Sequence, residues 1–235
     1  MALPGGVSAI REPWRTAVAW LGAAGLTSAG LAVAERNAGR WRQVERLLDS
    51  GVAQPVTTSA GRLFDAVAAL AGVRDTVNYE GQAAIELEQR AAAVPETDGY
   101  PAGIDGGLVR AGDLVRAVVA DLRRDTPVAL VAARFHDGLA DVLARAATEA
   151  AAAHGRDTVA LSGGVFQNVR LLGGVTRRLR AAGLRVLVHS RVPCNDGASR
   201  SGRSRWPRPL PEPGDNGRPY ARSCPPRGRL STDPA

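Results

Sequence analysis

The chain has 235 residues, enough for one domain with a real core or for two small lobes, and its 45% hydrophobic content is that of a soluble globular protein. Of the net charge of +7, residues 197–235 contribute +5 and residues 1–196 only +2, so the folded body lacks the basic face of a nucleic-acid-binding protein. No apolar run approaches the roughly 18 residues of a membrane span, and two cysteines make neither a disulfide framework nor a metal cluster. We expect a cytoplasmic protein with no membrane or nucleic-acid partner.

The first 51 residues predict two helices. Residues 9–22 place their apolar side chains on one stripe, and Pro13 lies near the first turn, where proline is tolerated. Residues 31–51 carry Trp41 and Val44 among many charged residues, which form a solvated face. Both segments are therefore interpreted as packing elements.

The next informative stretch is Pro55-Val-Thr-Thr-Ser-Ala-Gly-Arg-Leu-Phe-Asp65. Ser59 is a candidate N-cap for a helix over residues 61–71. Asp65 falls in the first turns of that helix, where a carboxylate suits the helix dipole. Taken alone, the pattern makes Asp65 a surface or capping residue.

A second helix start follows in Val77-Asn-Tyr-Glu-Gly-Gln-Ala-Ala-Ile-Glu-Leu-Glu88. Gly81 breaks the chain before a helix that carries Glu86 among other acids. On its own this is an exposed helix N-terminus. Residues 106–124 then alternate short apolar runs and end in a helix.

Residues 127–153 predict one long helix that contains Arg134-Phe-His-Asp-Gly. His136 is a candidate acid or base because imidazole titrates near neutral pH. A structural histidine at a packing interface is the interpretation that we prefer.

Strong signals come together in Val159-Ala-Leu-Ser-Gly-Gly-Val-Phe-Gln-Asn168. Residues 158–161 predict a buried strand, residues 167–182 a helix with Val169, Leu172, Val175 and Leu179 at helical spacing, and residues 183–189 a second strand. These elements make a βαβ unit, so the sheet is parallel or mixed.

The turn between the first strand and the helix has the chemistry of a nucleotide site. Gly163 and Gly164 let a ligand approach the backbone. The helix N-terminus behind them suits phosphate, and Asn168 can donate to and accept from a ribose or base. A tight turn without a ligand is the alternative.

The C-terminal segment changes character at Arg191-Val-Pro-Cys-Asn-Asp-Gly197, which alone is an Asn-Asp-Gly turn. Residues 198–235 are rich in proline and arginine without apolar periodicity, so we expect a disordered tail. The abrupt change suggests a reading-frame shift just after Asp196.

Four of these stretches together resemble one family. Thr-Ser-x-Gly-Arg-Leu-Phe-Asp, Tyr-Glu-Gly-Gln-Ala-Ala-x-Glu-Leu-Glu, Ser-Gly-Gly-Val-Phe-Gln-Asn and Pro-x-Asn-Asp-Gly are similar to the HypF-type carbamoyltransferases of hydrogenase maturation. The resemblance covers residues 1–197, the C-terminal part of the carbamoyltransferase domain. It implies an α/β fold like the second lobe of the actin–hexokinase type.

The resemblance also assigns roles. It implies that ATP or carbamoyl adenylate contacts Asp65, Gly81, Glu86, Gly163, Gly164 and Asn168. It makes Asp196 a ligand of Mg²⁺ or Fe²⁺, since a hard carboxylate oxygen suits either ion. The family's metal site also needs a His-x-x-x-His pair, which this sequence does not contain.

The family's reaction begins with carbamoyl phosphate and ATP, which give carbamoyl adenylate. The carbamoyl group then passes to the C-terminal cysteine of a maturation partner. Because the histidine pair and the zinc-finger, acylphosphatase-like and adenylate-forming domains of the full-length family are not in this sequence, we expect a truncated form without turnover of its own. An O-carbamoyl or tRNA threonylcarbamoyl transferase relative and a non-catalytic nucleotide-binding fragment are the alternatives.

Overall fold

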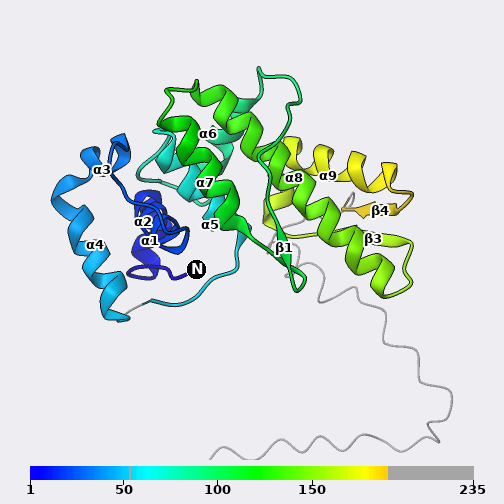
Figure 1. The fold of residues 1–235 in the computed structure, drawn as a ribbon, viewed down its shortest axis with the longest axis horizontal. Coiled ribbons are helices and arrows are strands. Elements are labelled where there is room, and N and C mark those ends of the chain that lie inside the picture. The colour runs from blue at the N-terminus through cyan, green and yellow to red at the C-terminus, as the bar shows by residue number, and fades with distance from the viewer. Residues whose placement is uncertain (53, 190–235) are drawn as a thin grey trace, which may run out of the picture.

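The structure is a computed structural model that describes residues 1–52 and 54–189. Helices dominate, and two short two-stranded sheets complete the fold (Figure 1). The elements in chain order are α1 (Val7–Arg11), α2 (Pro13–Ala23), α3 (Ala32–Arg36), α4 (Ala38–Ser50), α5 (Ala60–Leu70), α6 (Gln82–Ala91), β1 (Ile104–Asp105), β2 (Leu108–Val109), α7 (Ala111–Leu122), α8 (Val128–Ala153), β3 (Thr158–Leu161), the 3-10 helix η1 (Gly164–Gln167), α9 (Val169–Ala181) and β4 (Arg185–Val188).

Each of the two predicted N-terminal helices is in fact two helices. Pro13 has no amide hydrogen and takes the first position of α2, so the chain breaks at Glu12 and α1 is separate. The second predicted helix breaks at Asn37, between α3 and α4. Pro13 therefore marks the start of a separate helix, α2, and not the first turn of one helix over residues 9–22.

The core lies around α5, which is buried on all sides. Every residue from Leu63 to Leu70 is buried, and α5 packs against α2, α6 and α7. Ser59 is the N-cap residue, as predicted, but its side chain makes no capping hydrogen bond. The long helix α8 then joins this core to α9 and β3 (Figure 1).

The predicted βαβ unit is present. Strands β3 and β4 pair in parallel, with Thr158 opposite Arg185 and Leu161 opposite Val188. The α/β fold class with a parallel sheet is therefore confirmed, although the second sheet, β1–β2, is an antiparallel hairpin.

The buried face of α9 differs from the prediction. Leu171, Val175 and Leu179 are buried, whereas Val169 is 75% exposed. The helix begins at Val169 because Asn168 caps it, and the four residues before Asn168 form η1 instead of a first α-helical turn. Val169 lies two residues before Leu171, about 200° around the helix, so it is on the opposite face from the buried residues.

Helix α8 and the loop before β1 cross at a point where each of the two segments has a glycine. A Cβ atom on Gly138 would lie 2.3 Å from the carbonyl oxygen of Tyr100, and one on Gly99 would lie 2.1 Å from the Gly138 nitrogen. Both obstacles are backbone atoms, so a side chain at either position would force the two segments apart.

We expect Gly138→Ala to lower the free energy of unfolding by about 1–3 kcal/mol, the usual cost of overpacking. The same change at Gly39, which is helical and has no atom within 4 Å of its Cβ position, should raise stability by about 0.5–1 kcal/mol. Urea denaturation measures both. Equal effects at the two positions would show that the crossing is not tightly packed.

No helix within residues 1–52 and 54–189 is long and apolar enough to cross a membrane.

Candidate functional site

One cavity of about 800 Å³ collects most of the predicted nucleotide-binding residues. It lies between the start of α5, the start of α6 and the turn that joins β3 to α9. The predicted residues that line it are Asp65, Gly81, Gly163, Gly164 and Asn168. These residues are up to 103 positions apart in the printed sequence, so the fold itself brings them together.

Asp65 is a buried carboxylate, not the surface residue that its helix position suggested. It is 3% exposed, and its Oδ2 atom lies 2.7 Å from Nη1 of Arg62. The two atoms form an ion pair without the alignment of a hydrogen bond, so Oδ2 has no hydrogen-bond donor among the described residues. Burial raises the pKa of Asp65 to about 6, although the charge of Arg62 acts in the opposite direction.

The glycine turn presents open backbone to the cavity. Gly163 has φ 105° and ψ 152°, a conformation that favours glycine, and no atom lies within 4 Å of its Cβ position. The amides of Gly163 and Gly164 donate to no acceptor within the described part of the chain. Two free amides in consecutive residues suit an anionic oxygen.

Gly81 opens the opposite wall. It is the N-cap of α6 with φ 82°, and a Cβ atom there would meet nothing within 4 Å. From Gly81, the residues that line the cavity follow helical spacing through Ala84 and Ile85 to Glu88.

Glu86 is not among the residues that line the cavity. Its carboxylate accepts hydrogen bonds from Arg74 at 2.6 and 2.9 Å and from Gln82 at 2.9 Å. Two positions along a helix correspond to a rotation of about 200°, so Glu86 points away from the side that Glu88 shares with Gly81. The cavity acid of α6 is therefore Glu88.

Glu88 also occupies the place where we expected phosphate. Its Oε1 atom accepts hydrogen bonds from the amides of Val169 at 2.7 Å and Arg170 at 3.1 Å. The predicted phosphate site at the N-terminus of α9 thus already holds an internal carboxylate. On the turn itself, the amides of Gly163 and Gly164 have no acceptor among the described residues and remain for an anion.

Asn168 lines the cavity but is only 8% exposed. Its Oδ1 atom accepts from the amide of Leu171 at 2.8 Å, and its Nδ2 atom lies 2.9 Å from Nε2 of His136. Both ends of the amide are thus used by the protein. Asn168 shapes the cavity wall, and its side chain has little capacity left for a ligand.

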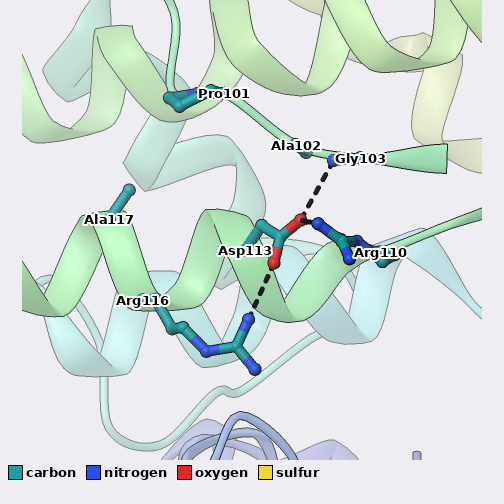
Figure 2. A pocket seen from close by; sticks show the side chains of 7 residues that line it. All are labelled: Pro101, Ala102, Gly103, Arg110, Asp113, Arg116 and Ala117. Atoms are coloured by element: carbon teal, nitrogen blue, oxygen red, sulfur yellow. Dashed lines mark hydrogen bonds and ion pairs between the residues drawn. The ribbon is translucent and has the colours of Figure 1, made fainter.

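A second hollow of about 520 Å³ lies beside α7 (Figure 2). Asp113 accepts hydrogen bonds there from the amide of Gly103 at 3.0 Å, from Arg110 at 3.1 Å and from Arg116 at 2.7 Å. Its charged groups thus bind one another and tie the loop before β1 to α7. This hollow is structural.

Comparisons with known proteins show the family of the chain. The family model "Carbamoyltransferase, Kae1-like Domain, second subdomain" matches residues 1–202. The chain belongs to this family. It is 39% identical over 211 residues to carbamoyltransferase HypF of Rhizobium leguminosarum bv. viciae, covering 88% of this chain and 27% of that protein.

Two further carbamoyltransferase HypF proteins are similar to this chain. The HypF homolog of Cupriavidus necator is 40% identical over 209 residues, covering 83% of this chain and 52% of that protein. The crystal structure of full-length HypF in the phosphate- and nucleotide-bound form superimposes with a TM-score of 0.72 and 31% identity, covering 83% of this chain and 26% of that one. The chain thus spans between about a quarter and a half of the length of these relatives.

The remaining predicted carbamoyltransferase site residue is Asp196. It and the predicted tail, residues 198–235, lie outside the described residues, so the metal ligand stays a prediction. Within residues 1–52 and 54–189, no three His, Cys, Asp or Glu side chains come together as a metal site. We therefore assign no metal ligand from the structure.

Sequence reasoning missed three charged residues of the cavity: Arg62, Glu80 and Glu88. The signal for Arg62 was its position three residues before Asp65, which places both on one face of α5. Glu88 lies seven residues after Gly81, two helical turns along the same face. Glu80 immediately precedes Gly81 and gave no separate signal.

Proposed function

We propose that this chain supplies the nucleotide-binding part of a carbamoyltransferase of hydrogenase maturation. The observation that carries the proposal is the cavity that joins Asp65, Gly81 and the Gly163–Gly164 turn. The relative of known structure that is 31% identical was solved, by its own description, with phosphate and nucleotide bound.

Each part of the nucleotide has a matching group. The Asp65 carboxylate, which lines the cavity beside its ion-pair partner Arg62, accepts a ribose hydroxyl, since a carboxylate oxygen accepts hydrogen bonds strongly. The free amides of Gly163 and Gly164 receive a phosphate oxygen. Ala84 and Ile85 give the cavity an apolar side.

The reaction that we propose is carbamoyl transfer from carbamoyl adenylate, made from carbamoyl phosphate and ATP. A cysteine thiolate at the C-terminus of a maturation partner attacks the carbamoyl carbon, and AMP leaves with the electron pair of the broken bond. The described residues of this chain bind and orient the adenylate. The nucleophile belongs to the partner.

Isothermal titration of the 235-residue chain with ATP and Mg²⁺ tests the proposal. Gly164→Glu places a carboxylate on the turn that receives phosphate, and we expect it to weaken ATP binding by at least about tenfold through charge repulsion. Gly39→Glu adds the same charge to an exposed helix with free space around it and should leave the affinity unchanged. Adenosine, which has no phosphate, should bind the wild type and both variants alike.

Two results would contradict the proposal. One is the absence of ATP binding by a wild-type chain whose circular dichroism shows it folded. The other is equal weakening by the two glutamate substitutions, which would mean that net charge and not the turn decides the affinity.

A further inference from the structure

His136 is a buried histidine at the back of the nucleotide cavity. It lies on α8, is completely buried, and is not a cavity-lining residue itself. Its ring nevertheless contacts two residues that do line the cavity, Phe64 from α5 and Asn168 from the turn before α9. It therefore stands where the two walls of the cavity meet.

The hydrogen bonds of the ring determine its tautomer. Nδ1 lies 2.7 Å from the carbonyl oxygen of Ala132, which can only accept, so Nδ1 carries the proton. Oδ1 of Asn168 already accepts from the amide of Leu171. The Asn168 group that faces Nε2 is therefore the NH₂ donor, and Nε2 accepts. Burial lowers the pKa of His136 to about 4, which keeps the ring neutral at pH 7.

The other wall is held by ring packing. Phe64 meets His136 edge to face, with ring centroids 5.1 Å apart and an angle of 69° between the planes. Phe64 immediately precedes Asp65, the proposed ribose acceptor. A shift of the His136 ring would thus move both the Asp65 wall and the turn that ends at Asn168.

We propose that His136 is a positioning residue that fixes the Gly163–Gln167 turn relative to Asp65 by accepting a hydrogen bond from Asn168. The inference rests on the proposed function, because it gives His136 a role in ATP binding. His136 touches no ligand. It acts through Asn168, whose side chain in turn holds the start of α9.

Four variants test this inference, again by titration with ATP and Mg²⁺. His136→Leu removes the acceptor, and we expect about tenfold weaker binding, the upper range for one neutral hydrogen bond. His136→Gln retains an acceptor at the ε position and should recover affinity to within about threefold. Asn168→Ser keeps an N-cap oxygen but is too short to reach His136, so it should weaken binding like His136→Leu. The double variant, His136→Leu with Asn168→Ser, should be no weaker than either one.

A spectroscopic readout accompanies the titration. Two-bond ¹⁵N–¹H correlation spectra at pH 7 should show one of the three histidines protonated at Nδ1 and unprotonated at Nε2, and that signal should be absent from His136→Gln. Protonation of His136 at Nε2 in the wild type would overturn the inference whatever the affinities are.

The outcomes separate the inference from the proposed function. If the wild type binds ATP and His136→Leu binds it equally well, the inference is overturned and the proposed function stands. Additive losses in the double variant would also overturn it. If the wild type binds no ATP, the proposed function fails and the inference fails with it. If His136→Leu does not fold, the ATP affinities of Asn168→Ser and His136→Gln give the same decision: the inference expects the first to be weakened about tenfold and the second by no more than about threefold.

Discussion

Replacing Arg170 with alanine should lower the free energy of unfolding by about 3–5 kcal/mol, because it leaves a buried carboxylate without its partner. Arg170 binds Asp137 through two parallel hydrogen bonds of 3.0 and 2.7 Å, and the Asp137 side chain is 2% exposed. The same guanidinium donates to the carbonyl oxygens of Ala91, Val94 and Pro95. One side chain thus joins α9, α8 and the end of α6.

Urea denaturation at pH 7 measures this loss, and Arg177 on the same helix is the matched control. Arg177 pairs with Glu96 at 2.8 Å, but both side chains are exposed, so Arg177→Ala should cost at most about 1 kcal/mol. Arg170→Lys should fall between the two, since it keeps the charge and loses the planar fork. Similar losses for Arg170→Ala and Arg177→Ala would refute the role of burial.

The Arg170–Asp137 pair also predicts acid sensitivity. Burial raises the pKa of Asp137, but the hydrogen bonds from Arg170 and Thr97 outweigh it and hold the pKa below the ordinary value of 3.8. A carboxylate with a lowered pKa stabilises the fold above pH 3.8, and that contribution is lost as the pH falls through the folded-state pKa.

Asp65→Asn should have the opposite dependence on pH. Asp65 has a pKa of about 6 in the folded protein against an ordinary 3.8. Below pH 3.8 both states carry the proton, and between pH 3.8 and 6 only the folded state keeps it. Ionised Asp65 therefore lowers stability by about 3 kcal/mol above pH 6. Asparagine does not titrate, so the stability of the variant relative to the wild type should rise by about this amount between pH 4 and 8.

The same substitution should weaken ATP binding by about tenfold, because a neutral amide is a poorer acceptor for ribose than a carboxylate. Urea denaturation over the pH range gives the first effect and titration with ATP the second. Asp49→Asn, at an exposed position, should give a curve parallel to the wild type. A pH-independent difference between Asp65→Asn and the wild type would rule out a raised pKa.

Local sequence predicted the elements whose signals are local. The apolar run of residues 158–161 lies between turn residues, and β3 has those bounds. The parallel pairing followed from the βαβ order. The predicted start of α9, residue 167, was two residues too early. Asn168 is extended and follows a 3-10 turn, but its place in the sequence is also that expected for the second residue of a helix.

Burial of the site could not be predicted in the same way. Helix α5 is buried all round, from Leu63 to Leu70, so its sequence has no polar face from which the burial of Asp65 could be inferred. The choice between Glu86 and Glu88 depended on helical phase, and Glu88 faces the cavity because it lies two turns from Gly81. The bond between His136 and Asn168 joins residues 32 positions apart, a relation that only the packing of α8 against α9 creates.

Helix α8 has 26 residues, which is about 39 Å of helix, and it packs against α6 and α7 as well as α9 and β3. A single rigid rod shared by two groups of elements makes their opening cooperative: neither group can separate from α8 without exposing its apolar side chains. A ligand that binds beside α9 therefore stabilises all the elements that pack against α8. Amide hydrogens as far away as α7 will exchange with solvent more slowly when the cavity is filled.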